Sequence, residues 1–551
     1  MSTGNSKRAT AFWLSVALAA FTLTAIFVNP LRDNTLDDDW ANALTVRHLL
    51  DTGTYALNDW AVTDMPFHAY LGAGASLVFG YSPAVLRLVT LFMALVGLVA
   101  FYKLAREHDM DGRQAGLLSC IWLASPLLLR SSYTFMTNVT FVSLLVLATW
   151  LYARGMRTRS LPVMIAASLA AAACILTRPF GIALAAGLVI VWFTDRELRR
   201  SLGLLAAGIL LPLAASVQQI IAAAGGNSWG LQYARAAETA YLGATGHLAA
   251  NVLWRPSVVI LYLALFMLPL AIPAVREFLF SLRAGSQVSA RERSIGLPIV
   301  LAVLLTAVIL LGHIVLDTPR MMPYAGWSFE IIKRFKPIGR GLFSAGACIG
   351  AVLMLRGIII TRLGRGTWHA APFAGRLLFA TAAVMLLANI CFFRFGDEYI
   401  LTYIPFALIT VGYFLRSWIS RLTAVTAVSS LAVLLCAALW TRGIIAGEEA
   451  GWLLGEQVRR QGVPVEAVHG TLNWNCYNGL FNRYLAETNR APATDLNGFF
   501  TWYHEHQLHS QYVVTASPNA RSDTSWQRAS FALYRDFLLQ TQPVYLIRRV
   551  H

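Results

Sequence analysis

Long apolar runs separated by short polar segments recur along about the first 440 residues of the chain. A helix needs roughly 20 apolar residues to cross the hydrocarbon core of a bilayer, and most of the runs approach that length. The pattern predicts a polytopic α-helical membrane protein with about thirteen transmembrane helices. We expect these helices at residues 11–30, 82–103, 115–129, 139–153, 161–176, 180–193, 202–224, 256–275, 297–316, 341–360, 377–393, 400–415 and 424–441.

Two stretches between the first and second runs have helical character but are too short to span a bilayer. Residues 38–50 repeat apolar side chains at near-helical spacing, and residues 66–79 form an apolar stretch that glycines interrupt. Both are typical of helices that lie on the membrane plane. The segment 225–254 is also predicted to be partly helical, over residues 231–242.

The periodicity changes after residue 441, where the chain becomes less apolar. Short β-rich runs alternate there with amphipathic stretches, which is typical of a small α/β domain. We therefore divide the chain into a transmembrane domain at 1–443 and an α/β domain at 444–551. Within the second domain we expect helices at 450–460, 476–485 and 526–538, and strands at 463–468, 512–516 and 544–548.

Composition and charge agree with a membrane protein and orient it. The chain is 57% hydrophobic and 13% charged, whereas soluble domains average roughly 25% charged residues. Its net charge of +16 comes mostly from arginine in short loops, which marks cytoplasmic loops, and no nucleic-acid-binding motif accompanies it. The N-terminus is thus predicted to be cytoplasmic. Loops 31–80, 225–254 and 317–340 and the α/β domain are predicted to lie outside. Arginine- and alanine-rich, lysine-poor usage suggests a GC-rich bacterial genome. For a protein of the bacterial inner membrane, the predicted topology places the C-terminal domain in the periplasm.

One predicted external loop, at residues 317–340, departs from this charge rule. It carries five basic side chains on the side where few are expected. Basic groups kept there suggest an anionic ligand such as a phosphate. Contact with anionic lipid headgroups is the alternative. The basic residues are Arg320, Lys333, Arg334, Lys336 and Arg340.

Three consecutive aspartates, Asp37, Asp38 and Asp39, follow the first apolar run. Adjacent carboxylates repel one another, so a cluster at a membrane edge suggests a role. Such a cluster can hold a metal ion, orient a polar acceptor or remove a proton. The alternative is a solvated loop at the membrane edge.

Several short motifs occur in an order that resembles a known family. An acidic pair, Asp38 and Asp39, is followed by a helical stretch that ends at Gly53. The chain thereby resembles the GT-C superfamily of polyprenyl-phosphate-sugar-dependent glycosyltransferases, near the bacterial relatives of protein O-mannosyltransferase and of the aminoarabinose lipid A transferase. The other matching segments are 84–89, 135–139, 176–178, 322–324, 397–401 with Pro405, and 473–475.

The resemblance implies a membrane enzyme that moves a sugar from a polyprenyl-phosphate donor to a lipid, glycan or protein acceptor on the periplasmic face. It implies Asp38 as the base, with Asp39 holding the acceptor or a divalent metal together with Asp38. The chain departs from the family pattern at Asn138, where an aspartate is common, and at Glu398, where an arginine is common. The amide of Asn138 supplies no charge, so it cannot be the second carboxylate of a metal site, and whether the protein binds a metal is left undecided by the sequence.

Further side chains are candidates for binding donor or acceptor. Arg178 is a candidate for phosphate, with snorkelling to lipid headgroups as the alternative. His68 could assist the base, although a lone histidine in an apolar stretch is more often structural. The remaining substrate-binding candidates are Asn138, Tyr324, Lys333, Arg334, Lys336, Arg340, Glu398 and Tyr399.

Two other functions remain open. A flippase or exporter of lipid-linked glycans would place charges near the middle of the membrane. The predicted charges lie at the external rim instead, which favours the enzyme. A homologue that binds polyprenyl phosphate without catalysis is the other alternative, and Asn138 keeps it open.

Overall fold

The computed structural model describes most of the helical domain and most of the C-terminal domain. The predicted runs at 297–316 and 341–360, and the basic loop at 317–340, lie outside the described residues. The described residues are 3–195, 199, 201–267, 269–270, 373–392, 395–414, 419–420, 423–489, 496–517 and 526–550.

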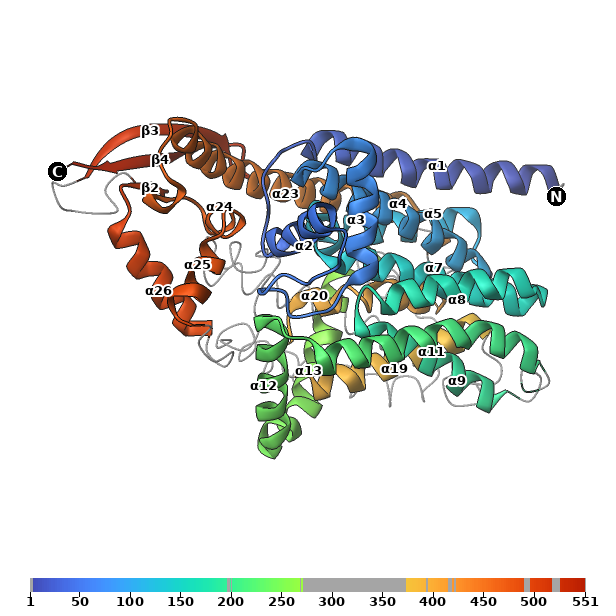
Figure 1. Ribbon diagram of the computed structural model, residues 1–551. Helices are drawn as coiled ribbons and strands as arrows, with labels where there is room; N and C mark the ends of the chain where they lie inside the picture. The colour runs from blue at the N-terminus through green and yellow to red at the C-terminus, as the bar shows by residue number, and fades with distance from the viewer. Residues whose placement is uncertain are drawn as a thin grey trace.

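Helices that run side by side form a bundle, with the N-terminus at the end away from the C-terminal domain (Figure 1). Every predicted apolar run within the described residues overlaps one of these helices. The bundle helices are α1 Thr3–Val28, α4 Pro83–Glu107, α5 Gly112–Ala124, α6 Pro126–Ser132, α7 Thr137–Thr158, α8 Leu161–Ile175, α9 Ile182–Thr194, α11 Leu202–Gly225, α13 Thr245–Phe266, α19 Phe373–Cys391, α21 Ile404–Phe414 and α23 Thr423–Arg460.

The predicted fold class, a multi-span helical membrane protein with a small C-terminal sheet, is confirmed. Within the described ranges, six helices are long and apolar enough to cross a membrane, or seven if α5 and α6, bent by 67°, form one span. Helices α8, α9 and α21 are apolar but shorter. The count of thirteen therefore stays a prediction.

Two short helices occupy the end of the bundle that faces the C-terminal domain (Figure 1). Helix α2 spans Asp39–Thr52 and α3 spans Pro66–Phe79, where helices are predicted. Helix α2 ends because Gly53 adopts φ 70° and donates its N–H to the carbonyl of Leu49, a conformation that glycine adopts without strain. That α2 and α3 lie on the membrane plane stays a prediction. Helix α12, Trp229–Gly243, covers the predicted helix at 231–242.

The C-terminal domain contains a four-stranded sheet in the order β1-β2-β4-β3. Strand β1 pairs in parallel with β2, and the two other pairs are antiparallel. The strands are β1 Val468–His469, β2 Tyr512–Thr515, β3 Trp526–Arg535 and β4 Thr541–Arg549, and the domain's short helices are η2 Val465–Ala467, α24 Leu472–Tyr477, α25 Leu480–Glu487 and α26 Leu496–His509. Two further short helices, η1 Pro179–Gly181 and α20 Asp397–Ile400, belong to the helical domain.

Three predictions in this domain are wrong in detail. The helix predicted at 526–538 is strand β3, because its side chains alternate between faces and it pairs with β4 from Trp526 to Arg535. The strand predicted at 463–468 is reduced to two residues, Val468–His469. The helix predicted at 476–485 is divided into α24 and α25 at Gly479, whose φ of 94° ends helical geometry.

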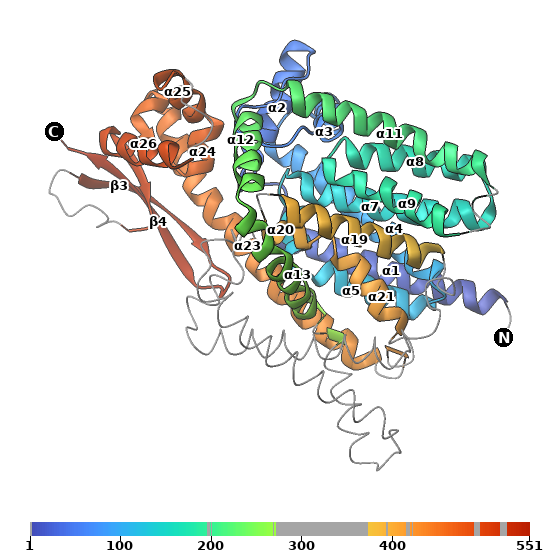
Figure 2. The same cartoon turned by 90° about the horizontal axis from the view of Figure 1, so that it is seen from below.

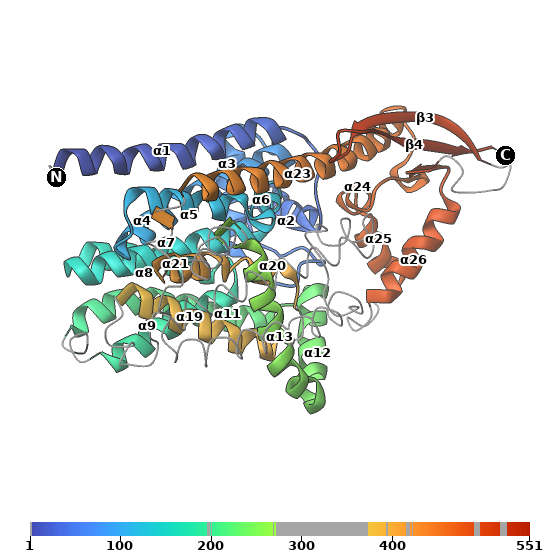
Figure 3. The same ribbon diagram turned by 180° about the vertical axis from the view of Figure 1, so that it is seen from behind.

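The predicted domain boundary at 443/444 falls inside α23, which runs from the bundle into the C-terminal domain (Figure 3). A glycine occurs at every fourth position along this part of the helix. A Cβ added at the first, third or fourth of these glycines would clash with the turn after β3, with Thr471 or with Trp474, and one added at the second would press tightly on Tyr534. Residues four apart share a helix face, so this stripe is where the domain approaches α23 closely. The glycines are Gly443, Gly447, Gly451 and Gly455.

An aromatic cluster joins the C-terminal domain to the end of the bundle. Trp40 of α2 and Trp229 of α12 pack with Phe481 of α25 and Phe499 of α26. The ring of Trp60, in the loop after α2, lies 4.9 Å from that of Phe481 and 5.4 Å from that of Phe499. Figure 2 shows α12 between the bundle and this domain. These contacts place the domain over the helix ends that hold the site.

Candidate functional site

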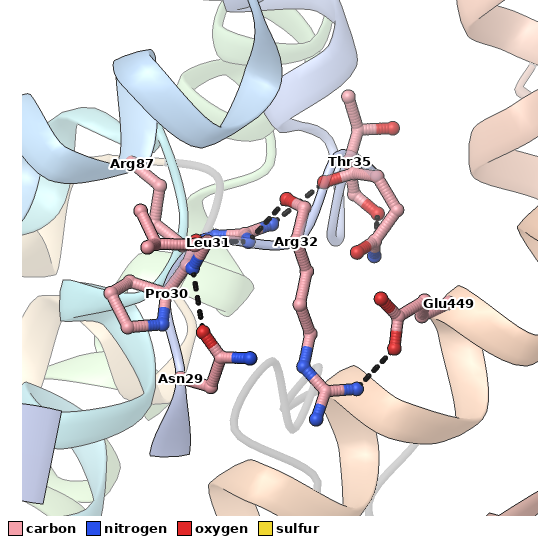
Figure 4. A network of polar contacts seen from close by, with 8 residues as sticks. Asn29, Pro30, Leu31, Arg32, Thr35, Arg87 and Glu449 are labelled. Carbon is pink, nitrogen blue, oxygen red and sulfur yellow. Dashed lines mark hydrogen bonds and ion pairs between the residues drawn. The ribbon is translucent and has the colours of Figure 1, made fainter. Parts of the chain in front are cut away.

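The segment between α1 and α2 leads to the three aspartates, and a buried arginine holds it. The guanidinium of Arg87, in α4, is 1% exposed and donates to carbonyl oxygens of this segment (Figure 4). Arg32 in the same segment forms an ion pair with Glu449 of α23. The segment is therefore held from two sides. The acceptors of Arg87 are the carbonyls of Pro30, Arg32 and Asn34, at 2.7–2.9 Å, and the carbonyl of Tyr133, at 2.7 Å.

The three aspartates have different environments. Asp37 adopts φ 55°, in the left-handed region that aspartate tolerates better than most residues. Asp38 is the N-cap residue of α2, but its carboxylate makes no capping hydrogen bond. Asp37 and Asp38 both line a pocket, whereas Asp39 does not.

Asp39 is committed to the backbone. Its Oδ1 accepts the N–H of Leu36 at 2.8 Å, and its Oδ2 accepts the N–H of Phe135 at 2.9 Å. Burial raises the pKa of this carboxyl to about 7, although both amides and the charge of Arg87 lower it. The prediction that Asp39 holds acceptor or metal is therefore unsupported by its placement: it braces the segment that carries Asp38.

The pocket encloses about 1100 Å³, including solvent at its open side. Its lining comes from helix ends: the start of α2 and α7, the end of α6 and α8, and α20. The site thus lies at the end of the bundle under the C-terminal domain. Five predicted site residues line it: Asp38, Asn138, Arg178, Glu398 and Tyr399.

Two arginines bring positive charge to the pocket. Arg130, at the end of α6, forms an ion pair with Asp37 at 2.6 Å. Arg178, after α8, donates from Nε to the hydroxyl of Thr137 at 2.7 Å. Its guanidinium lies 5.6 Å from the centroid of the Tyr399 ring, a cation–π geometry. Two oriented guanidinium groups beside two carboxylates can stabilise an anion while a neighbouring base acts.

Asn138 lies at the start of α7 and is 6% exposed. Its Oδ1 is buried and has no hydrogen-bond partner among the described residues. A buried amide oxygen without a partner costs stability, so it is available to a donor group of a ligand. The side chain can accept a hydrogen bond here, but it brings no charge.

The opposite wall comes from the loop after α2 and from α12. Residues 60–63 line the pocket together with Trp229 and Tyr233, whose rings stack with centroids 5.7 Å apart. Asp59 fixes this wall, since its Oδ1 accepts the N–H of Trp229 at 3.0 Å and its carbonyl accepts that of Gly230 at 2.6 Å. The pocket is consequently charged on one side and aromatic on the other.

His68 lies beneath the pocket rather than in it. Its ring stacks on that of Phe135 at 4.1 Å, and Nε2 lies 3.2 Å from the Phe135 carbonyl oxygen. Burial, together with the charge of Arg178, lowers the pKa of this imidazole to about 4. It is neutral at physiological pH and supports the backbone that Asp39 also holds. The candidates Tyr324, Lys333, Arg334, Lys336 and Arg340 lie outside the described residues.

The sequence interpretation missed Arg130, Trp60 and Trp229. No local signal singles out Arg130, because it ends a short helix in an apolar run and meets Asp37 only in the fold. Trp474 of α24, in the matching segment 473–475, is fully buried and donates its indole N–H to Glu456 at 2.9 Å. It packs the core of the C-terminal domain.

A family model matches part of the chain, over residues 63–218. It describes the dolichyl-phosphate-mannose-protein mannosyltransferase family. The predicted resemblance to lipid-phosphate-sugar-dependent glycosyltransferases is confirmed. The matched segment covers under a third of the chain and includes the pocket residues Arg130, Asn138 and Arg178. A comparison with curated protein sequences finds no match.

Solved structures show distant likeness. ArnT from Cupriavidus metallidurans bound to undecaprenyl phosphate is 14% identical, with a TM-score of 0.41 and 98% of this chain and 97% of that chain covered. The oligosaccharyltransferase AglB from Archaeoglobus fulgidus, with an inhibitory peptide and a dolichol-phosphate, is 15% identical, with a TM-score of 0.43 and coverage of 91% and 69%. A complex of the Archaeoglobus fulgidus oligosaccharyltransferase with Zn and sulfate is 13% identical, with a TM-score of 0.35 and coverage of 90% and 67%. Likeness at this level adds nothing to the chemistry of the site.

The residues described at the site do not fit the metal predicted on Asp38 and Asp39. Both carboxylate oxygens of Asp39 accept backbone N–H groups, and Asp39 does not line the pocket that Asp38 lines. Within the described ranges, no three His, Cys, Asp or Glu side chains gather to hold a metal. We therefore derive no catalytic step through a metal on this pair.

Proposed function

We propose that this protein is a membrane glycosyltransferase. It would move one sugar from a polyprenyl-phosphate carrier to a hydroxyl group of a lipid, glycan or protein acceptor. The observation that carries the proposal is the pocket, where Asp37 and Asp38 lie with Arg130 and Arg178 at the end of a multi-span bundle. The match of residues 63–218 to a family of lipid-phosphate-sugar enzymes supports the same reaction class.

Asp38 is the proposed general base. It lies at the N-terminus of α2, where the helix dipole favours a carboxylate, and it lines the pocket. Its carboxylate would take the proton of the acceptor hydroxyl as the oxygen attacks the anomeric carbon of the sugar. The new bond joins that oxygen to the anomeric carbon, and the bond from the anomeric carbon to the phosphate oxygen breaks. A single displacement of this kind inverts the anomeric configuration.

The leaving group is a lipid phosphate, whose charge grows as the bond breaks. Arg178 is oriented for this charge by the hydroxyl of Thr137 and the ring of Tyr399. Arg130 is the second cation, and its ion pair with Asp37 would loosen as phosphate binds. Asn138 and Glu398 would bind sugar hydroxyls. The basic residues predicted at 317–340 stay candidates for the same phosphate.

The position of the site favours a transferase over an exporter. The lining residues come from helix ends and from loops that contact the C-terminal domain, not from the middle of helices. An exporter needs charged groups near the middle of its path. We further propose that this end faces the periplasm of a bacterial inner membrane and that the N-terminus is cytoplasmic.

The test is transfer from a synthetic polyprenyl-phosphate sugar by the purified protein in lipid nanodiscs. We expect Asp38→Asn to lower the rate at least 100-fold, since general-base catalysis contributes roughly 10²–10⁴. Asp51→Asn is the matched control, because Asp51 is an exposed residue at the other end of α2. Normal transfer by Asp38→Asn would refute its role, and carrier movement across the bilayer without transfer would support an exporter.

A parallel measurement with a chelator tests the metal. We expect transfer to continue, because the described residues do not fit a metal on Asp38 and Asp39. Loss of activity that added divalent cation restores would show that a metal takes part. The Asp38 and chelator results are independent, so each part of the proposal can fail by itself.

A further inference from the structure

The turn between β3 and β4 exposes two leucines at a rigid site. Leu538 is 44% exposed and Leu539 is 51% exposed. The Asp536 carboxylate holds the turn by accepting the N–H groups of Leu538 at 2.9 Å and Gln540 at 3.0 Å. Exposed leucines in such a fixed turn present apolar surface to whatever lies beside the domain.

Leu539 also has an unusual backbone conformation. Its φ is 60°, in the left-handed region that glycine or asparagine normally occupies in turns. In a turn exposed to water, leucine is unfavourable at such a position, because its backbone is strained and its large apolar side chain is exposed.

The turn contacts α23 at a defined level of the bundle. The ring of Phe537 lies 5.0 Å from that of Trp440, and the backbone of the turn lies against Gly443. On α23, the exposed apolar residues Val428, Leu431 and Leu435 follow one face of the predicted last membrane span. Gly443 lies eight residues past Leu435, about 12 Å along the helix axis. The turn is thus close to where this lipid-facing surface ends.

Helix α1 gives a second marker of the same level. The guanidinium of Arg442 lies 4.8 Å from the centroid of the Phe27 ring. Ile26, beside Phe27, is 71% exposed, so the apolar outer surface of α1 reaches the level of Arg442. Gly443, which the turn touches, is the next residue of α23. Arginine and tryptophan at this level are typical of a membrane interface.

We propose that the β3–β4 turn, residues 536–540, is a membrane-contact element whose leucines lie among the lipids beside α23. Its occupant is the bilayer, because the exposed leucines of the turn lie beside α23 just past the level at which the exposed apolar residues of its predicted span end. Figure 3 shows the hairpin lying along α23. Arg535, exposed beside the turn, suits anionic headgroups. The C-terminal domain thereby has a second attachment to the membrane besides α23.

The experiment uses the full chain in nanodiscs of phosphatidylethanolamine and phosphatidylglycerol. The photoreactive residue p-benzoylphenylalanine replaces Leu538 or Leu539, and lipid adducts are quantified by mass spectrometry after illumination. Leu431 is the positive control, since it is 54% exposed on the span, and Glu505 of α26 is the exposed negative control. All variants are first checked for an unchanged elution volume and melting temperature.

We expect adduct yields at 538 and 539 that approach that of position 431 and exceed that of position 505 several-fold. A yield at both turn positions no higher than at 505 would overturn the proposal. Covalent dimers of the chain formed at 538 without lipid adducts would overturn it as well, in favour of a second copy covering the turn.

Discussion

Replacement of Arg87 by methionine should release the segment that carries the aspartates. The arginine is 1% exposed and lies in α4, at the start of the second predicted span. Methionine has a comparable length and keeps the packing, but it donates no hydrogen bond. The variant leaves four backbone carbonyls without their donor: those of Pro30, Arg32, Asn34 and Tyr133.

The magnitude follows from the number of bonds. A hydrogen bond from a charged donor contributes about 1.5–3 kcal/mol, and a buried acceptor left unpaired costs about 1–3 kcal/mol. Some of the four carbonyls regain water when the segment opens, so we expect a net loss of about 3–5 kcal/mol for the closed segment. That changes its opening equilibrium by roughly two to four orders of magnitude. The apolar core of the bundle does not depend on these bonds, so the protein should still fold.

The assay is hydrogen exchange by mass spectrometry on peptides that cover residues 29–39. We expect faster exchange there in Arg87→Met, together with reduced sugar transfer, and unchanged exchange in the middle of α7. Arg47→Met is the matched control, because the Arg47–Asp51 ion pair is exposed on both sides and such pairs contribute about 0–1 kcal/mol. Equal protection of residues 29–39 in the two variants would refute the role given to Arg87.

Two further predictions concern stability. Burial raises the pKa of the Asp39 carboxyl from 3.8 to about 7 in the folded protein. The protonated carboxyl therefore contributes fully to the free energy of unfolding below about pH 4, and this contribution is lost as the pH rises toward 7. Asp39→Asn should remove this slope of stability against pH, at most about 1.4 kcal/mol per pH unit, in urea titrations at pH 5 and 7. An unchanged slope would show that another group titrates. Gly455→Ala should destabilise the C-terminal domain by about 1–3 kcal/mol in thermal unfolding, because the added methyl group meets the buried ring of Trp474. The control is Gly74→Ala, which should be neutral or stabilising because its methyl group meets nothing within 4 Å. Equal melting temperatures for the two glycine variants would contradict the close packing.

The local pattern of apolar and polar residues is sufficient to predict most helices of the helical domain. Helices α2 and α3 were predicted because spacing and end signals such as Gly53 act within a few residues. Strand β3 was mistaken for a helix because Phe531, Ala532 and Leu533 are adjacent apolar residues, and their alternation becomes clear only beside β4. The glycine stripe of α23 was readable from its four-residue spacing but was not recognised.

The acidic cluster shows where local pattern ends. Chain order and hydropathy are enough to place three carboxylates at the start of a helix beside a membrane span. Only the tertiary structure decided that Asp39 turns to the backbone of Phe135, that Asp38 lines the pocket and that Asp37 meets Arg130. The physical reason is that only Asp39 lies in the helix, while Asp38 is its N-cap and Asp37 has a left-handed backbone, so the three side chains leave the chain in different directions. The partners of Asp37 and Asp39 also include residues about a hundred positions away in the chain.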